Sequence, residues 1–169
     1  IVAAAFTVFG VMQVRVEEEK LTDDLKRKAK HIAESMELSV KAVLSNNDLK
    51  NANYLVEKFQ KRERLQGCAI YDKDGRILAV TKKFAGWQEK QRPYLADVLT
   101  SGVARGELEE FEGYSVYSYL LPVSDDNGQL LGLVEVVYDT SYVSARMVEL
   151  WKNLSVTLII LVVLILLIS

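Results

Sequence analysis

The stretch 117–139, YSYLLPVSDDNGQLLGLVEVVYD, decides the fold of this 169-residue chain. Its two ends are rich in Tyr, Val and Leu, which favour strands, and the polar segment SDDNG between them is typical of a tight turn. Two strands joined by so short a turn pair in an antiparallel way. We therefore predict an antiparallel sheet that contains this hairpin.

The rest of the chain supplies three more strands and the helices around them. GCAIYD (67–72) and RILAV (76–80) flank a turn in which Gly75 can take a left-handed conformation, and GELEEF (106–111) is also typical of a strand. Helices are predicted at 15–44, 49–63, 92–102 and 139–154, with Pro93 at the start and Gly102 at the end of the third. The predicted class is α+β, a five-stranded antiparallel sheet with helices on its faces.

Both ends of the chain are apolar. Residues 154–169 carry no charge and follow Trp151 and Lys152, two residue types that favour a membrane interface, and residues 1–14 are also uncharged. Each run is somewhat short for a complete span, so we expect parts of two transmembrane helices. The predicted organisation is the end of a first transmembrane helix at 1–14, an extracytoplasmic domain at 15–153 and the start of a second transmembrane helix at 154–169.

Composition excludes several classes of function. The net charge of −2 and the absence of a Lys/Arg cluster on one helix face exclude nucleic-acid binding. Cys68 lies in an apolar strand and is expected to be buried, and the single His31 is expected at the surface of a charged helix. Metal-ligand spacings, a haem-attachment motif and a phosphate-binding glycine loop are absent. We therefore expect no enzyme activity, no cofactor and no metal in this fragment.

Two helical stripes predict a homodimer. Apolar and small residues recur at alternating four- and three-residue steps in the first helix, which is the spacing of a heptad seam. These residues are Leu25, Ala29, Ile32, Met36, Ser39 and Val43. A similar stripe in the last helix comprises Val143, Met147, Leu150 and Leu154. The alternative is that both stripes pack against the chain's own sheet.

The order of these segments resembles the single Cache domains, which are PAS-like extracytoplasmic sensors. The resemblance is carried by YDKDGRILAV (71–80), by RPYLADVLTSG (92–102) and by the Pro-Val strand, polar Gly turn and final apolar strand of 117–139. It covers almost the whole segment between the predicted spans. Members of this family occur in histidine kinases, chemoreceptors and cyclic-dinucleotide enzymes. The resemblance implies a dimeric receptor for a small extracellular ligand.

Amino-acid-binding relatives hold the ligand with aromatic residues and an Arg, which suggests a site in WQEKQRPY. Trp87, Arg92 and Tyr94 have a similar spacing here, and a guanidinium can bind a carboxylate with two hydrogen bonds. Pro93 and Leu95 depart from the family pattern. The alternative is that Arg92 forms a local salt bridge and Tyr94 belongs to the core.

Three residues on the predicted strands complete the candidate ligand site. Tyr117 and Tyr119 alternate with Ser118, so they lie on one face of their strand, and the sequence leaves open whether this face holds ligand or core. Glu135 interrupts an apolar strand, and a buried carboxylate there would need a ligand amine or a protein cation. Exposure at a sheet edge would explain it equally well.

The acidic segment that contains Glu107, Glu109, Glu110 and Glu112 allows a divalent-cation site or a solvated strand edge. Alternation along a strand separates these side chains onto two faces, which favours the solvated edge.

The sequence therefore predicts the sensor domain of a dimeric receptor in the cytoplasmic (inner) membrane, with the domain in the periplasm or extracellular space. The ligand is expected to be a small carboxylate or amino acid, and a cytoplasmic output domain is expected beyond the chain. The rival prediction is a membrane-anchored dimerisation or protein-interaction module that binds no small molecule.

Overall fold

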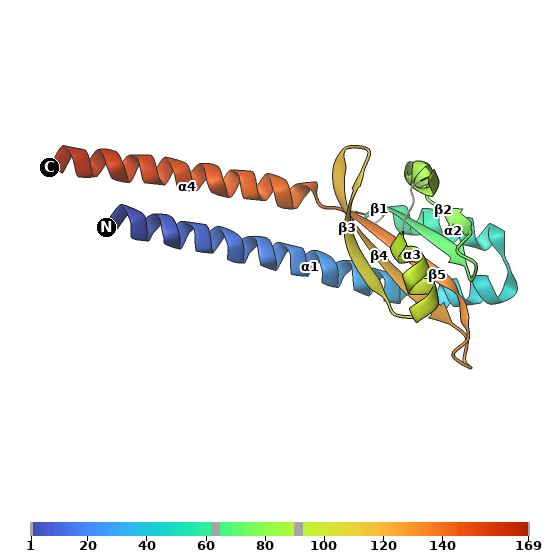
Figure 1. The fold of residues 1–169 in the computed structure, drawn as a ribbon. Coiled ribbons are helices and arrows are strands. Elements are labelled where there is room, and N and C mark those ends of the chain that lie inside the picture. Colours follow the sequence, from blue (N-terminus) through green and yellow to red (C-terminus); the bar gives the residue numbers. More distant parts are fainter. Residues whose placement is uncertain (1, 62–64, 90–92, 169) are drawn as a thin grey trace. The chain divides into compact units, whose positions relative to one another are not determined.

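The computed structural model describes residues 2–61, 65–89 and 93–168. Its elements follow the predicted order (Figure 1). They are α1 (Val2–Asn46), α2 (Leu49–Gln60), β1 (Leu65–Asp72), β2 (Ile77–Val80), η1 (Lys82–Glu89), α3 (Pro93–Ser101), β3 (Arg105–Phe111), β4 (Tyr114–Ser124), β5 (Leu130–Asp139) and α4 (Ser141–Ile168). The segment after residue 80, predicted as a loop, contains the 3-10 helix η1.

As predicted, the five strands form one antiparallel sheet, and the structure gives their order as β2-β1-β5-β4-β3. The central strand β5 passes into α4 through one residue, Thr140. The backbone N–H and the hydroxyl of Thr140 both donate to the carbonyl oxygen of Ser115 on β4, at 3.2 and 2.7 Å. This junction therefore remains bonded to the sheet.

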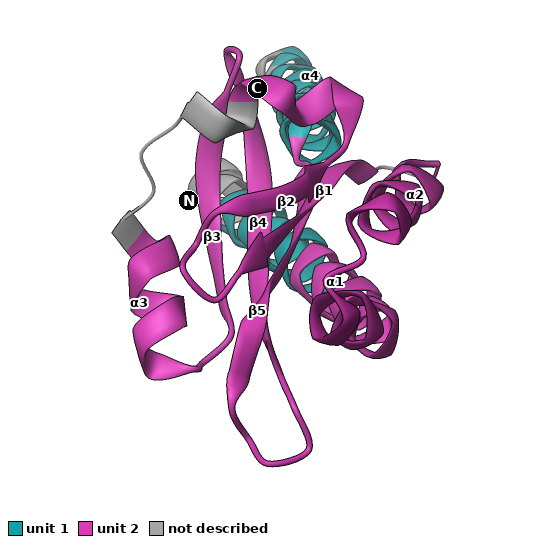
Figure 2. Ribbon diagram, turned by 90° about the vertical axis from the view of Figure 1, so that its right-hand side faces the viewer, with its two compact units in different colours: residues 1–24, 141–169 teal, residues 25–140 magenta. Residues whose placement is uncertain are grey.

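The chain divides into two compact units (Figure 2). Unit 1 comprises residues 1–24 and 141–169, and unit 2 comprises residues 25–140, which hold the whole sheet. Among the helices that the structure describes, none has the combined length and apolar character needed to cross a membrane. The predicted boundaries at residues 15 and 153 stay a prediction.

The register of the sheet assigns every strand residue to one of two faces, because directly paired residues point the same way. The helix face, as we call it, holds Cys68, Ile70, Tyr117, Tyr119, Val134 and Val136. The α3 face holds Ala69, Tyr71, Ser118, Leu120, Leu133, Glu135 and Val137. Figure 2 shows α1 and α2 on one side of the sheet and α3 on the other.

Contacts from α1 and α2 identify the helix face. The Cys68 thiol donates to the carbonyl oxygen of Val56 in α2, and a Cβ added at Gly132 would meet the side chain of Leu44 in α1. Lys41 of α1 also bonds the β4–β5 turn, with 2.6 Å between its Nζ and Oδ1 of Asp126. These contacts hold α1 and α2 against the sheet.

The structure corrects the predicted dimer seam of α1. Leu25, Ala29, Met36 and Val43 are buried within the chain itself, together with Ala33 and Val40, whereas Ser39 is exposed. Side chains that already fill the core of one chain cannot form the contact between two chains. The spacing therefore marks the core-facing side of α1, which was the alternative. Ile32 of α1 and the α4 residues Val143, Met147 and Leu150 are half-buried.

Candidate functional site

A buried carboxylate lies at the centre of the α3 face. Glu135 is on the central strand and is 0% exposed. The hydroxyl of Tyr71 donates to its Oε2 and the hydroxyl of Ser118 donates to its Oε1, both at 2.5 Å. Both carboxylate oxygens are therefore hydrogen-bonded, which is the condition under which a polar group is tolerated in an apolar interior.

The register explains how the three polar groups meet. Glu135 pairs with Ala69 on β1 and with Leu120 on β4. Tyr71 and Ser118 each lie two residues from those partners, on the same face, at the diagonal distance that a long side chain spans. The sheet therefore fixes the carboxylate between two hydroxyls from its neighbouring strands.

Apolar clusters lie on both sides of this carboxylate along β5. Leu133, two residues before Glu135, belongs to a cluster with Ala69, Tyr71, Tyr94, Val98 and Leu120. Val137, two residues after it, belongs to a cluster with Phe84, Phe111 and Val116. Tyr94 and Val98 come from α3 and Phe84 comes from η1, so these two elements cover the α3 face.

Gly67 allows η1 to pack on the sheet. A Cβ at this position would collide with Thr81 and touch the Phe84 ring. With glycine there, Phe84 packs against Phe111 with 4.6 Å between ring centroids. The η1 segment is thereby held above the strand residues next to Glu135.

Tyr94 carries an unusual polar group. Its side chain is 7% exposed, and its buried hydroxyl has no hydrogen-bond partner among the residues that the structure describes. A buried hydroxyl without a partner costs about 1–3 kcal/mol. The cluster that contains Tyr94 also contains Tyr71, whose hydroxyl binds Glu135. A polar ligand atom could satisfy the Tyr94 hydroxyl.

The structure brings together only some of the six predicted site residues. Tyr94 and Glu135 share the α3 face. Trp87 belongs to η1, but its side chain lies outside the described part, and Arg92 lies outside the described residues altogether. Their contribution to the site stays a prediction.

The structure does not bring Tyr117 and Tyr119 together with Glu135, because they lie on the opposite face of the sheet, and their part in a ligand site stays a prediction. Burial raises the pKa of Tyr119, and the negative charge of Glu34 on α1 adds to this effect. Burial likewise raises the pKa of Tyr117, whose ring fills the space that Gly106 leaves open. These two tyrosines therefore pack on the side of α1.

Sequence reasoning missed Tyr71 and Ser118 as partners of Glu135. Ser118 alternates with the two tyrosines that were selected, so the correct face was identifiable once Glu135 was paired with Leu120. The spacing of residues within one strand does not show which residues of the neighbouring strand they pair with. A buried acidic residue on a central strand is the signal that could have directed the search to hydroxyls on the neighbouring strands.

One residue of the acidic segment on β3, Glu107, forms a surface ion pair. Arg105 lies 2.6 Å from Glu107 and 3.1 Å from Asp97 of α3. Among residues 2–61, 65–89 and 93–168, no group of three acidic, His or Cys side chains is placed to hold a metal ion.

Comparisons with known proteins identify the fold. No protein-family model and no curated protein matches the chain. Solved structures do match, including the sensor domain of Escherichia coli DcuS, with 16% identity, a TM-score of 0.58 and coverage of 75% of this chain and 96% of that one.

Two further structures belong to larger domains. The sensor domain of the Vibrio cholerae histidine kinase DctB has 17% identity and a TM-score of 0.61. The match covers 83% of this chain and 58% of the DctB domain. The ligand-binding domain of the Pseudomonas aeruginosa amino-acid chemoreceptor PctC was solved with GABA. It has 18% identity and a TM-score of 0.57, and the match covers 78% of this chain and 59% of the PctC domain. The chain thus spans less than two thirds of these two domains. It has the α+β, PAS-like fold of histidine-kinase and chemoreceptor sensor domains, as its resemblance to single Cache domains implied.

Proposed function

We propose that unit 2 is the ligand-sensing domain of a dimeric transmembrane receptor and that its ligand binds on the α3 face. Two observations on that face carry this proposal: Glu135 is a fully buried carboxylate, and the buried Tyr94 hydroxyl has no hydrogen-bond partner among the described residues. Both lie on the face covered by the short elements η1 and α3. The fold shared with sensor domains supports the same function.

The ligand is a small molecule with an ammonium group. Glu135 accepts hydrogen bonds and carries negative charge when ionised, so it favours a cationic donor and disfavours a second anion nearby. Tyr94 provides a further hydroxyl, and the flanking clusters of Leu120, Leu133 and Phe84 favour an apolar ligand body. The PctC domain solved with GABA and the Campylobacter jejuni Tlp3 domain solved with L-valine support a ligand of this kind.

Trp87 and Arg92 extend the proposed site. In the sequence both precede Pro93, the first residue of α3, which is the helix that carries Tyr94. An Arg92 guanidinium would bind a ligand carboxylate, so an amino acid would engage Arg92 and Glu135 through its two charged groups.

The other parts of the proposed receptor are those that the sequence predicts. The apolar ends of α1 and α4 lie in the cytoplasmic membrane, unit 2 lies in the periplasm or extracellular space, and an output domain follows beyond the chain. Ligand binding favours one arrangement of these two helices, which biases the receptor between its states. The domain itself is not an enzyme. Its structural neighbours are sensor domains.

Three ligands with the same branched carbon skeleton test the site. L-valine carries an ammonium and a carboxylate group, isobutylamine carries only the ammonium group, and isovalerate carries only the carboxylate group. We expect L-valine to raise the melting temperature most, isobutylamine less and isovalerate not at all. Ligand at a hundred times its Kd stabilises the folded state by about 2.7 kcal/mol, which corresponds to a shift of several degrees.

Variants of Glu135 and Arg92 test which side chain binds the ammonium group of the ligand and which binds its carboxylate group. Glu135→Gln should abolish the response to isobutylamine, and Arg92→Ala should reduce the response to L-valine to that of isobutylamine. Tyr119→Phe, on the helix face, is the matched control and should leave all responses intact. If none of a wider panel of amino acids, amines, carboxylates and divalent cations shifts the melting temperature, the rival function as an interaction module without a ligand is favoured instead.

A further inference from the structure

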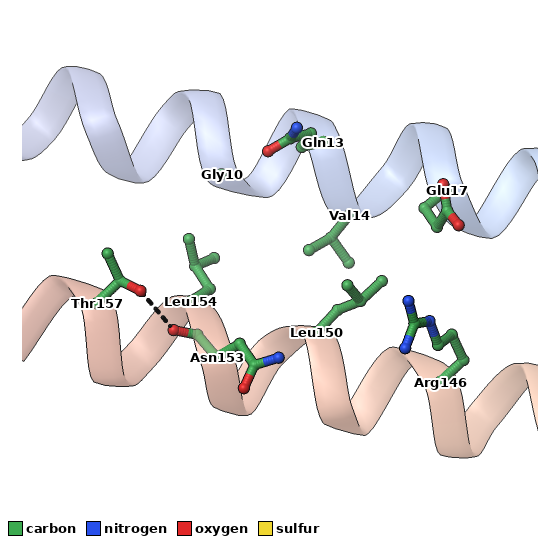
Figure 3. A pocket seen from close by; sticks show the side chains of 9 residues that line it. All are labelled: Gly10, Gln13, Val14, Glu17, Arg146, Leu150, Asn153, Leu154 and Thr157. Carbon is green, nitrogen blue, oxygen red and sulfur yellow. Dashed lines mark hydrogen bonds between the residues drawn. The ribbon is translucent and has the colours of Figure 1, made fainter.

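Unit 1 contains a crevice between α1 and α4 that the ligand-sensing role leaves unexplained. Its volume is about 430 Å³, which lies within the range of small-molecule sites. Figure 3 shows the residues that line it, which come from one stripe of each helix. All of them belong to unit 1, so the crevice is separate from the α3 face of the sheet.

The lining of the crevice changes from charged to uncharged along its length. Figure 3 shows Glu17 and Arg146 together at one end and Thr157 at the other. The two helices change in the same direction, because residues 1–14 of α1 and 153–169 at the end of the chain carry no charge. The crevice therefore spans the boundary at which both helices lose their charged side chains.

The charged end offers one anion and one cation to a ligand. Arg146 contacts Glu149 on its own helix at 2.7 Å. Because its planar guanidinium has five N–H donors, Arg146 can bind a phosphate group as well. Glu17 is half-buried and has no ion-pair partner within the described part of the chain. A ligand that carries both an anionic and a cationic group would satisfy both side chains.

The uncharged end offers an apolar surface with few free polar groups. A Cβ at Gly10 would collide with the side chain of Leu154, so glycine allows the two helices to approach closely here. The Thr157 hydroxyl donates to the carbonyl oxygen of Asn153 at 2.9 Å (Figure 3). A hydroxyl that bonds its own helix in this way needs no water.

Exposed apolar side chains surround this uncharged end on both helices. They are between 48% and 63% exposed and comprise Val8, Phe9, Met12, Val156, Ile159 and Ile160. Water alone would leave this surface unburied, and a hydrocarbon chain alone would leave the charges at the other end without partners. An amphiphile with a charged head and an apolar tail matches both ends of the crevice.

We infer that the crevice binds one phospholipid that carries a primary ammonium group, with its phosphate at Arg146, its ammonium at Glu17 and its acyl chains over the uncharged end. A guanidinium binds a phosphate with two parallel hydrogen bonds, and a carboxylate favours a charged N–H donor. The inference rests on the proposed function, which places the apolar ends of α1 and α4 in the membrane. The charged end of the crevice then lies at the level of the lipid headgroups.

The two charges also specify the headgroup. Phosphoethanolamine supplies a phosphate for Arg146 and an N–H donor for Glu17. Phosphocholine has a quaternary ammonium group without an N–H, so it cannot donate a hydrogen bond to the carboxylate. Phosphoglycerol brings a second anion close to Glu17 without a cation that would compensate it. Phosphatidylethanolamine is therefore the expected lipid.

Short-chain lipids test this preference. Native mass spectrometry of the whole chain in mild non-ionic detergent measures the binding of the dioctanoyl forms of phosphatidylethanolamine, phosphatidylcholine and phosphatidylglycerol. We expect the ethanolamine lipid to bind at least about tenfold more tightly than the other two, the ratio expected for one lost charged hydrogen bond. Glycerophosphoethanolamine has the same headgroup without acyl chains, and it should not compete at the same concentration.

Variants with matched controls locate the lipid. Glu17→Gln should remove the preference for phosphatidylethanolamine over phosphatidylcholine, and Arg146→Gln should weaken the binding of all three lipids about tenfold. Glu18→Gln and Lys152→Gln are the controls, because both residues are exposed charges on the same helices but outside the lining of the crevice. These two variants should keep the wild-type preference.

Three outcomes would overturn the lipid site. They are equal binding of the three lipids to the wild type, an unchanged preference in Glu17→Gln, and equally tight binding of the headgroup without acyl chains. The comparison of lipids on the wild type needs no variant, so the inference stays testable if a variant does not fold. The L-valine response, measured on the same samples, reports separately on the proposed ligand site in unit 2.

Discussion

The two faces of the sheet bury different kinds of side chain. On the helix face, the small or aliphatic side chains of Cys68, Ile70 and Val136 pack beneath α1 and α2, and the ring of Tyr117 is also buried. On the α3 face, Glu135 is equally buried, and it lies among hydroxyls beneath the short elements η1 and α3. Buried side chains therefore have a different role on each face. The helix face contributes mainly stability, whereas the α3 face retains polar groups that an apolar core would not need.

The largest expected effect concerns the helix face. Met36→Glu places an unpaired carboxylate in the core formed by α1, and it should lower the free energy of unfolding by about 4 kcal/mol or more. The control Leu38→Glu, two residues away and exposed, should change it by less than about 0.5 kcal/mol. Urea denaturation measures both. A stable Met36→Glu chain that only loses dimerisation would restore the original interpretation of the stripe as a dimer seam.

The second prediction concerns the reactivity of Cys68 on the helix face. Burial, and to a lesser extent the negative charge of Glu135, raises the thiol pKa from 9.0 to about 12. At pH 8 iodoacetamide should therefore alkylate the folded chain about a thousandfold more slowly than the urea-unfolded chain. Because the folded-state pKa is the higher one, this group's contribution to stability is complete below pH 9 and decreases as the pH rises toward 12. Equal alkylation rates would show that α2 does not seal this face.

A pair of tyrosine variants sharpens the comparison within the α3 face. Tyr71→Phe removes a donor to the buried carboxylate and should lower the free energy of unfolding by about 2 kcal/mol. Tyr94→Phe removes a hydroxyl without a partner among the described residues, and it should leave stability unchanged or raise it by about 1 kcal/mol. Both variants should weaken ligand binding. Equal destabilisation in denaturant titrations would indicate that the Tyr94 hydroxyl also contributes to the fold.

The smallest expected effect comes from converting the α3 face into an apolar one. In the triple variant Glu135→Met, Tyr71→Phe and Ser118→Ala, the carboxylate and its two donors are removed together, so none of these three groups is left buried without its partner, and Tyr94 is unchanged. The free energy of unfolding should stay within about 1 kcal/mol of the wild-type value, while the L-valine response is lost. A strongly destabilised triple variant would mean that the polar cluster is required for folding, which would remove the distinction between the faces.

The order of elements could be predicted from the sequence because local signals specify it. The Gly turns at 75 and 128 have positive φ angles of 79°, as tight hairpins require, and the strands between them are rich in β-branched and aromatic residues. The η1 helix was not predicted. It depends on a tertiary contact, the packing of Phe84 above Gly67, that local sequence does not show.

The candidate site was harder to predict, because it depends on which strands are neighbours. Glu135 and Tyr94 were selected for their residue types, and the structure places both on one face. Tyr117 and Tyr119 were equally attractive as residue types, but only the pairing of β4 with β5 shows that they point away from Glu135. The heptad spacing of α1 was correct as a pattern. It could not distinguish the chain's own sheet from a second chain.

The short connection at Thr140 determines how motion on the sheet can leave it. Five residues of β5 and connector separate Glu135 from the first residue of α4 at position 141, and Thr140 is held to Ser115 by two hydrogen bonds. A strand displacement too small to break these bonds has no slack loop in which to dissipate. A displacement of β5 that leaves these bonds intact would therefore carry Thr140 and Ser115 with it, up to the last residue of unit 2.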